Sequence, residues 1–172
     1  MIDPKLFLPE IAEQYRLNPA HTHGLSHWAR VLENGLKLAE KEDGDTTVIS
    51  LFAIFHDACR HNQTLDHRHG VRGAKLAEKI LAVNPLVSSD QLHLLTEACR
   101  DHTKGKTQAN ITVQICWDSD RLDLARVGIM PHPRKLCTRT AKDPTVINWA
   151  NDRALNEFSP AYVEIDWTPY FK

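Results

Sequence analysis

Hydrophobic positions recur at helical spacing in nearly every segment of the chain that shows a period. From Ser26 to about Glu42, apolar residues return every three to four positions, which predicts a helix with one buried face. The next segment, VISLFAIFHDACR, follows a cap at Thr46 or Thr47 and is almost entirely apolar before His56. We therefore expect this second helix to be buried on most of its faces.

Capping residues and prolines divide the rest of the chain into further predicted helices. Their approximate limits are Asp3 onward with a break at Pro9, Asp66 to Val83, Ser88 or Ser89 to His102, Asn110 to Ile129, and Asp143 to Phe158. The segment after Asn110 begins with β-branched residues, as a strand would, but its apolar positions do not alternate, so a helix is the better interpretation. We find no repeat or linker, and the pattern predicts one all-α domain over residues 1–172.

Composition describes an ordinary globular chain with an excess of histidine. Of the 172 residues, 42% are hydrophobic and 25% are charged, and the net charge of −1 argues against nucleic acid or a membrane surface as partner. No apolar run approaches the roughly 20 residues that cross a bilayer, and the N-terminus does not resemble a secretory signal, so we expect a cytoplasmic protein. The four cysteines form no CxxC pair. The ten histidines favour a metal or proton-transfer site.

Ionisable residues interrupt the predicted apolar helices at three places. His56 and Asp57 are the only ionisable groups in VISLFAIFHDA, and a buried carboxylate costs several kcal/mol unless it is paired or bound to a cation. His27 shares its helix with core residues, and three aspartates interrupt ICWDSDRLDL. Taken singly, each has a structural alternative: a His–Asp hydrogen bond at a helix end, a core histidine, and an acidic helix face paired with arginines.

Taken together, the order of these residues resembles the HD-domain superfamily of metal-dependent phosphohydrolases, which is named for an adjacent His-Asp pair. His27 matches the first histidine, in an H-x-x-R-V context, and His56-Asp57 match the doublet. The segment DSDRLD resembles the closing D-x-D-R-L-D motif. In that motif Asp120 is carried over as the ligand, and Asp118 is the alternative if the register slips by two.

The resemblance covers about residues 20–130 and leaves a C-terminal helix and tail, 131–172, outside it. It implies an HD-type helical bundle that holds one divalent metal ion through His27, His56, Asp57 and Asp120. A set of two imidazoles and two carboxylates is compatible with Mn, Fe, Ni, Co or Mg and does not distinguish among these metals. The implied activity is hydrolysis of a small phosphoester or a nucleotide by a metal-activated water.

Other polar residues between the doublet and the closing motif are candidates for catalysis or substrate binding. His69 and His102, together with Asp57, are candidates for proton transfer. They are also possible ligands of a second metal ion, although the 12 residues from Asp57 to His69 are few for a two-metal arrangement. Asp66 is a further candidate acid, because nucleotidase-like members have an acidic residue three positions after the doublet, where this chain has Arg60. The candidates for phosphate binding are Arg60, Arg72, Arg121 and His23.

Two alternatives to a phosphohydrolase stay open on sequence grounds. Some members of the HD fold use iron and O₂, and a di-iron oxygenase would require both His69 and His102 as ligands. A non-catalytic module that senses a nucleotide is the other alternative, and the intact set of four ligands argues against it. Neither the substrate nor the oligomeric state follows from the sequence.

Overall fold

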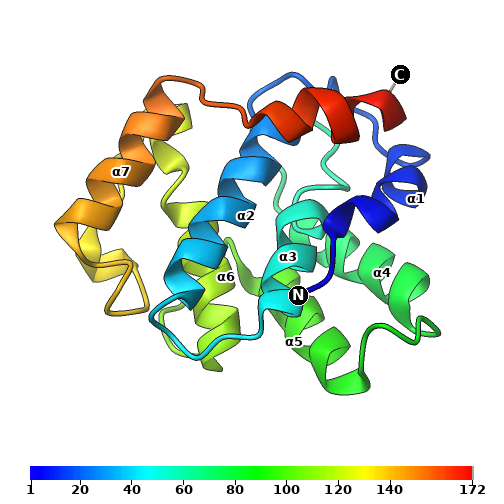
Figure 1. The fold of residues 1–172 in the computed structure, drawn as a ribbon, viewed down its shortest axis with the longest axis horizontal. Helices are drawn as coiled ribbons and strands as arrows, with labels where there is room; N and C mark the ends of the chain where they lie inside the picture. The colour runs from blue at the N-terminus through cyan, green and yellow to red at the C-terminus, as the bar shows by residue number, and fades with distance from the viewer. Residues whose placement is uncertain (172) are drawn as a thin grey trace.

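Caps and prolines fix the start of most helices in the computed structural model, which describes residues 1–171. The side chains of Asp45, Ser88, Asn110 and Asp143 accept hydrogen bonds from backbone N–H groups in the helical turns that follow them. The resulting α-helices are α1 (Leu8–Ala12), α2 (Leu25–Ala39), α3 (Thr46–Phe55), α4 (His69–Leu81), α5 (Ser89–Asp101), α6 (Ile111–Arg121) and α7 (Pro144–Leu155), as Figure 1 shows. Shorter helical turns are η1 (Pro4–Phe7), η2 (Leu124–Val127), η3 (Pro133–Lys135), η4 (Val163–Trp167) and η5 (Thr168–Tyr170).

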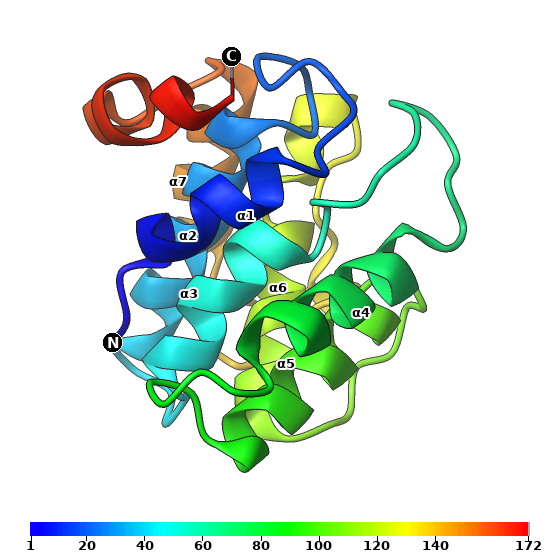
Figure 2. The ribbon, with the colours of Figure 1, turned by 90° about the vertical axis from the view of Figure 1, so that its right-hand side faces the viewer.

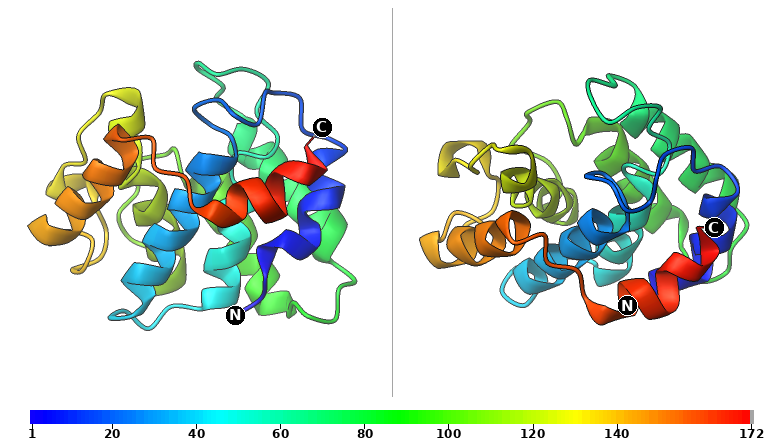
Figure 3. Two further views of the ribbon diagram at one scale, coloured as in Figure 1. Left: turned by 45° about the horizontal axis from the view of Figure 1, so that its top comes forward. Right: turned by 90° about the horizontal axis from the view of Figure 1, so that it is seen from above.

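Helix α3 forms the centre of the bundle. All of its residues from Val48 to Phe55 are buried, and it packs against α2, α4, α5 and α6. Helix α7 packs against η2 and α2, and the C-terminal turns η4 and η5 lie across α2 and α1 (Figure 1, Figure 3). Residues 1–171 contain no strand, so the predicted all-α fold is confirmed. No helix in this part of the chain is long and apolar enough to cross a membrane.

The His-Asp doublet lies in the turn after α3, whereas the sequence pattern placed it inside the helix. His56 Nδ1 donates to the carbonyl oxygens of Phe52 and Ala53, at 3.0 and 3.1 Å. A side chain thus satisfies carbonyls of the last helical turn, and the chain is free to leave the helix after Phe55. The connection from α3 to α4 then extends away from the helices before it returns (Figure 2).

Two glycines allow α4 to return to close contact with the end of α3 and with α5. A Cβ atom at Gly70 would lie 2.2 Å from the carbonyl oxygen of Cys99 on α5, and a Cβ atom at Gly73 would lie 2.3 Å from the carbonyl oxygen of Phe55. Both distances are too short for any side chain, so glycine is required for this backbone approach. The contact places His69, the first residue of α4, beside the doublet.

Candidate metal centre

Four side chains from three helices converge in the middle of the bundle. His27 comes from α2, His56 and Asp57 follow α3, and Asp120 lies in the last turn of α6. His27 Nε2 lies 3.1 Å from His56 Nε2. Asp57 Oδ2 lies 3.7 Å from the first of these nitrogens and 3.9 Å from the second, and Asp120 Oδ1 lies 3.6 and 3.9 Å from them. These four residues, which the resemblance implies as metal ligands, are called the first ligand group below.

A second ligand group consists of Asp57, His69 and His102. His69 Nε2 lies 2.9 Å from His102 Nε2, and Asp57 Oδ1 lies 3.1 and 3.8 Å from these two nitrogens. Asp57 therefore belongs to both groups and directs one carboxylate oxygen to each. All three residues are buried, as are His27 and His56. The short chain segment between Asp57 and His69 does not prevent this arrangement, because α4 returns to the end of α3 at Gly73.

Hydrogen bonds at Nδ1 fix the direction of all four histidine rings. His69 and His102 donate from Nδ1 to backbone carbonyl oxygens of the preceding turn, at 2.5 and 2.7 Å, and His56 does the same at the end of α3. His27 donates from Nδ1 to Asp123 Oδ2 at 2.7 Å. Because carbonyl and carboxylate oxygens only accept, Nδ1 carries the proton and Nε2 of the neutral ring presents a lone pair to the ligand groups.

The facing Nε2 atoms are the feature that a metal ion would explain. Two unprotonated nitrogens 3.1 Å apart in the first group, and 2.9 Å apart in the second, repel one another unless a cation or a proton lies between them. Burial, together with the Arg126 cation, lowers the pKa of His27 well below its usual range, and burial lowers the pKa of His102 to about 4. Protonation of His27 and of His102 is thus disfavoured near neutral pH, and the two buried groups could bind metal ions.

Arg60 borders the second ligand group. Its Nη1 atom lies 3.4 Å from Asp57 Oδ1 and 3.3 Å from His69 Nε2. The remaining donors of the guanidinium are held by the carbonyl oxygens of Asn62 and Thr64, at 3.3 and 2.6 Å. Arg60, a candidate for phosphate binding on sequence grounds, thus lies beside the second group with its charge next to Asp57 and His69.

Asp66 and Arg72 lie outside both ligand groups. Asp66 accepts hydrogen bonds from the backbone N–H groups of His61 and Arg68 and pairs with the Arg72 guanidinium. Burial would raise the pKa of Asp66, but these hydrogen bonds and the arginine lower it to about 2. This carboxylate stabilises the turn before α4, so the structure corrects the assignment of Asp66 as a catalytic acid.

Arg121 and Asp118 also make hydrogen bonds to the backbone of other segments of the chain. Arg121 donates to the carbonyl oxygens of Lys135 and Lys106, at 2.9 and 2.7 Å, which corrects its assignment to phosphate binding. Asp118 accepts from the backbone N–H groups of Cys137 and Thr138, at 2.7 and 2.8 Å, and is fully buried. The alternative register is therefore not the one that brings an aspartate to the histidines.

His23 lies beside the first ligand group. Its ring centroid is 6.2 Å from that of His27, and its Nδ1 atom is 2.8 Å from Gln63 Oε1. The Gln63 contact joins the loop before α2 to the loop after α3. His23 therefore lies at the edge of the first ligand group, while His69 and His102 belong to the second ligand group.

Sequence reasoning missed three residues that surround His27. Asp123 accepts the His27 Nδ1–H group and also pairs with Arg30, whose Nε atom lies 2.7 Å from Asp123 Oδ1. Arg126 lies 3.8 Å from Asp120 Oδ1 and donates to the carbonyl oxygen of Asp123 at 3.0 Å. The signal was present in the closing motif, because DSDRLD ends in Asp123 and an arginine follows three residues later.

Replacement of Asp123 by asparagine is expected to weaken metal binding by about 10–100-fold. Asparagine keeps one acceptor oxygen and replaces the other by an amide nitrogen, so either His27 Nδ1 or Arg30 Nε would face a second donor. A competition titration with a chromophoric chelator measures the affinity, and Asp152→Asn, an exposed acid of α7, is the matched control. Equal affinities for D123N and D152N would contradict an orienting function of Asp123.

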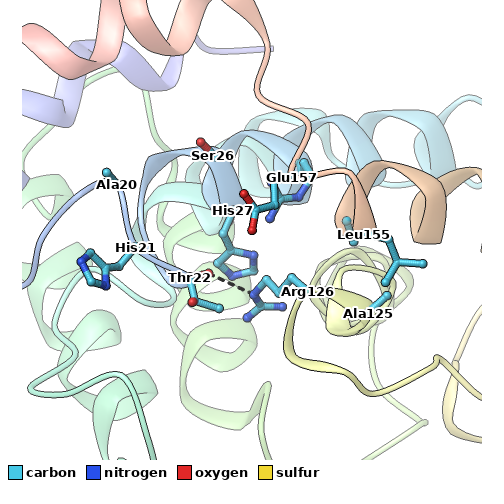
Figure 4. A pocket seen from close by; sticks show the side chains of 11 residues that line it. Ala20, His21, Thr22, Ser26, His27, Ala125, Arg126, Leu155 and Glu157 are labelled. Atoms are coloured by element: carbon cyan, nitrogen blue, oxygen red, sulfur yellow. Dashed lines mark hydrogen bonds between the residues drawn. The ribbon is translucent and has the colours of Figure 1, made fainter.

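A polar pocket of about 440 Å³ opens at the first ligand group. Figure 4 shows Ser26 and His27 of α2, Arg126 of η2 and Glu157 around it, with Arg126 donating to the carbonyl oxygen of Thr22. The Arg126 side chain is only 7% exposed, so a ligand in this pocket would meet a fixed guanidinium next to His27. This pocket is called the His27 pocket below.

Comparison with known proteins gives one distant relationship. Over 114 residues the chain is 26% identical to the symmetrical bis(5'-nucleosyl)-tetraphosphatase of Staphylococcus aureus, and the match covers 59% of each protein. The chain thus spans about 59% of the length of that relative. No protein-family model and no solved structure matches the chain. The relative is named as a nucleotide phosphatase, which suggests a hydrolase.

Proposed function

We propose that this protein is a metal-dependent phosphohydrolase of the HD-domain type, acting on a phosphoester or phosphoanhydride bond of a nucleotide. The observation that carries the proposal is the pair of facing Nε2 atoms in each ligand group, arranged around the shared carboxylate of Asp57. A divalent cation bound there would lower the pKa of a coordinated water and neutralise charge on the phosphoryl group. The distant likeness to a tetraphosphatase supports the same reaction class.

The residues of the chain contribute orientation and charge to this reaction. Asp123 and the backbone carbonyls hold the imidazoles in place, while Arg126, which lies beside Asp120, and Arg60, which lies beside Asp57, would bind phosphate oxygens. In the hydrolysis, the oxygen of water forms a bond to phosphorus, the bond to the leaving oxygen breaks, and a proton from the water passes to the departing group. The buried position of the ligands limits the access of other water molecules.

Metal removal is expected to destabilise the protein measurably. An ion that binds only the folded state stabilises it by about 2.7 kcal/mol at 100 times its Kd, so the melting temperature should fall after chelation and rise when metal returns. Calorimetry with Mn²⁺, Fe²⁺, Co²⁺, Ni²⁺ and Mg²⁺ tests this. His27→Ala should lose the response, and His132→Ala, which replaces an exposed histidine, should keep it. A melting temperature indifferent to metal in the unaltered protein would refute a metal centre.

The reaction class is tested with a panel of substrates for the metal-loaded protein. The panel contains phosphate monoesters, phosphodiesters, nucleoside polyphosphates and diadenosine tetraphosphate, and the readout is chromatography of the nucleotide products together with released phosphate. We expect turnover of at least one nucleotide and none after chelation. Protein that binds metal but turns over no member of the panel would leave a sensing module as the better explanation.

The second ligand group also favours a second candidate, a di-iron oxygenase. That function requires two ions per chain, with His69 and His102 as ligands, and the structure brings these two histidines together with Asp57. Elemental analysis of protein grown with iron, followed by measurement of O₂ consumption, distinguishes the two functions. Phosphate release without O₂ consumption is the result that we expect.

A further inference from the structure

A second pocket, of about 390 Å³, is strongly basic. Its lining includes Arg60, the arginine that lies beside Asp57. It opens between α4, the loop after α1 and the turn after α3, and its positively charged lining residues are Arg16, Arg60, Arg72, Lys75 and Lys79. None of the described residues that line it is acidic. We call it the α4 pocket. A local excess of this kind is not expected from a chain whose net charge is −1.

Much of the positive charge in the α4 pocket is free to meet a ligand. Arg60 and Arg72 each have a carboxylate partner, but within residues 1–171 no carboxylate lies within 4.0 Å of Arg16, Lys75 or Lys79. Positions 72, 75 and 79 are three and four residues apart, so one face of α4 carries all three cations. Lys75 and Lys79 have no carboxylate partner on this face, so their charges repel one another, and a polyanion would relieve this repulsion.

Arg60 connects the α4 pocket to the candidate metal centre. The residue lines the pocket, is 6% exposed, and has its Nη1 atom 3.4 Å from Asp57 Oδ1. The His27 pocket is lined by His27 itself, whereas the α4 pocket is lined by none of the ligands and borders the second group through Arg60. A buried arginine therefore lies between each ligand group and a pocket: Arg126 beside Asp120, and Arg60 beside Asp57.

We propose that the α4 pocket is a subsite for the polyphosphate chain of the substrate, so that the protein prefers compounds with several linked phosphates over phosphate monoesters. This inference rests on the proposed function and narrows its substrate class. A chain of linked phosphates carries several negative charges and many acceptor oxygens. Lysine offers it compact point charges, and arginine offers paired donors. A monoester that reacts at the ligand groups would not reach Lys75 and Lys79.

The double variant Lys75→Glu/Lys79→Glu tests the subsite. Both lysines are exposed on α4, and lysine and glutamate have similar helix propensities, so the fold should be retained. We expect KM for diadenosine tetraphosphate to rise by about tenfold or more, with kcat within about twofold, because two charge-assisted contacts are lost. Both constants for a monoester such as p-nitrophenyl phosphate should be unchanged. The control Lys41→Glu/Arg139→Glu changes the net charge equally at exposed positions outside the pocket.

A direct binding measurement separates failure of the subsite from failure of the proposed function. Calorimetric titration with inorganic tripolyphosphate, on metal-free protein, should show binding that K75E/K79E loses and K41E/R139E keeps. If this pattern appears without any hydrolysis, the anion site stands and the proposed function fails. If hydrolysis occurs but K75E/K79E behaves like its control in kinetics and titration, the subsite is refuted and the proposed function stands.

Discussion

Asp57→Asn is expected to abolish metal binding and to lower kcat/KM for any nucleotide substrate by at least on the order of a thousandfold. Asp57 is the only residue that belongs to both ligand groups, with Oδ2 directed to His27 and His56 and Oδ1 to His69 and His102. Asparagine keeps the shape but replaces a charged oxygen by an amide nitrogen, which donates and repels a cation. Elemental analysis and steady-state kinetics measure the two effects.

The control for this variant is Asp43→Asn, which removes one exposed charge from a loop. It should retain metal and activity, so that a loss seen only in D57N cannot be attributed to net charge. Circular dichroism establishes that both variants are folded. A D57N protein that keeps its metal and more than a tenth of its activity would show that the two ligand groups do not form the active centre.

The second large expected effect is on the stability of the fold, and it distinguishes Asp118 from Asp120 in the segment DSDRLD. Asp118→Ala is expected to lower the free energy of unfolding by about 3 kcal/mol, because the buried N–H groups of Cys137 and Thr138 and the Thr138 hydroxyl lose their acceptor. That is a large fraction of the roughly 5–15 kcal/mol that stabilises a typical domain. Metal content per folded chain should not change. Urea denaturation and elemental analysis measure the two quantities.

Asp120→Ala should behave in the opposite way. Its carboxylate lies near His27, His56 and Arg126 and accepts no hydrogen bond from the backbone of residues 1–171, so the variant should fold and lose metal. The pair of variants therefore tests which register of DSDRLD supplies the ligand. Loss of metal in folded D118A with retention in D120A would assign the ligand to Asp118.

Helix periodicity predicted the all-α fold, and the order of polar residues singled out the four members of the first ligand group. The neighbours of those residues were harder to assign, because a helix turns by roughly 100° per residue. Arg121 follows Asp120 directly yet points to the loop that contains Lys135, and Asp118 lies two residues away on nearly the opposite face. Adjacency in the sequence is therefore a poor guide to adjacency in the site.

The second ligand group was underestimated for a different reason. Spacing along the chain measures the length of the α3–α4 connection but not the path that it takes, and 12 residues suffice once α4 lies against the end of α3. Arg126 was missed because α6 ends at Arg121, and the separate turn η2 directs its side chain to the His27 pocket. Neither event follows from apolar periodicity.

The glycines of α4 set a condition for redesign of this centre. Transfer of the two ligand groups to another helical scaffold would need more than their six side chains. The backbone of α4 at Gly70 and Gly73 lies directly against the backbone at Cys99 and Phe55, and this close approach would have to be transferred too. We expect any larger residue at these two positions to move α4, and His69 with it, away from the end of α3, so that the second ligand group opens. Alanine at Gly73 is therefore a way to separate the two ligand groups by a change in the backbone, without replacing any of their side chains.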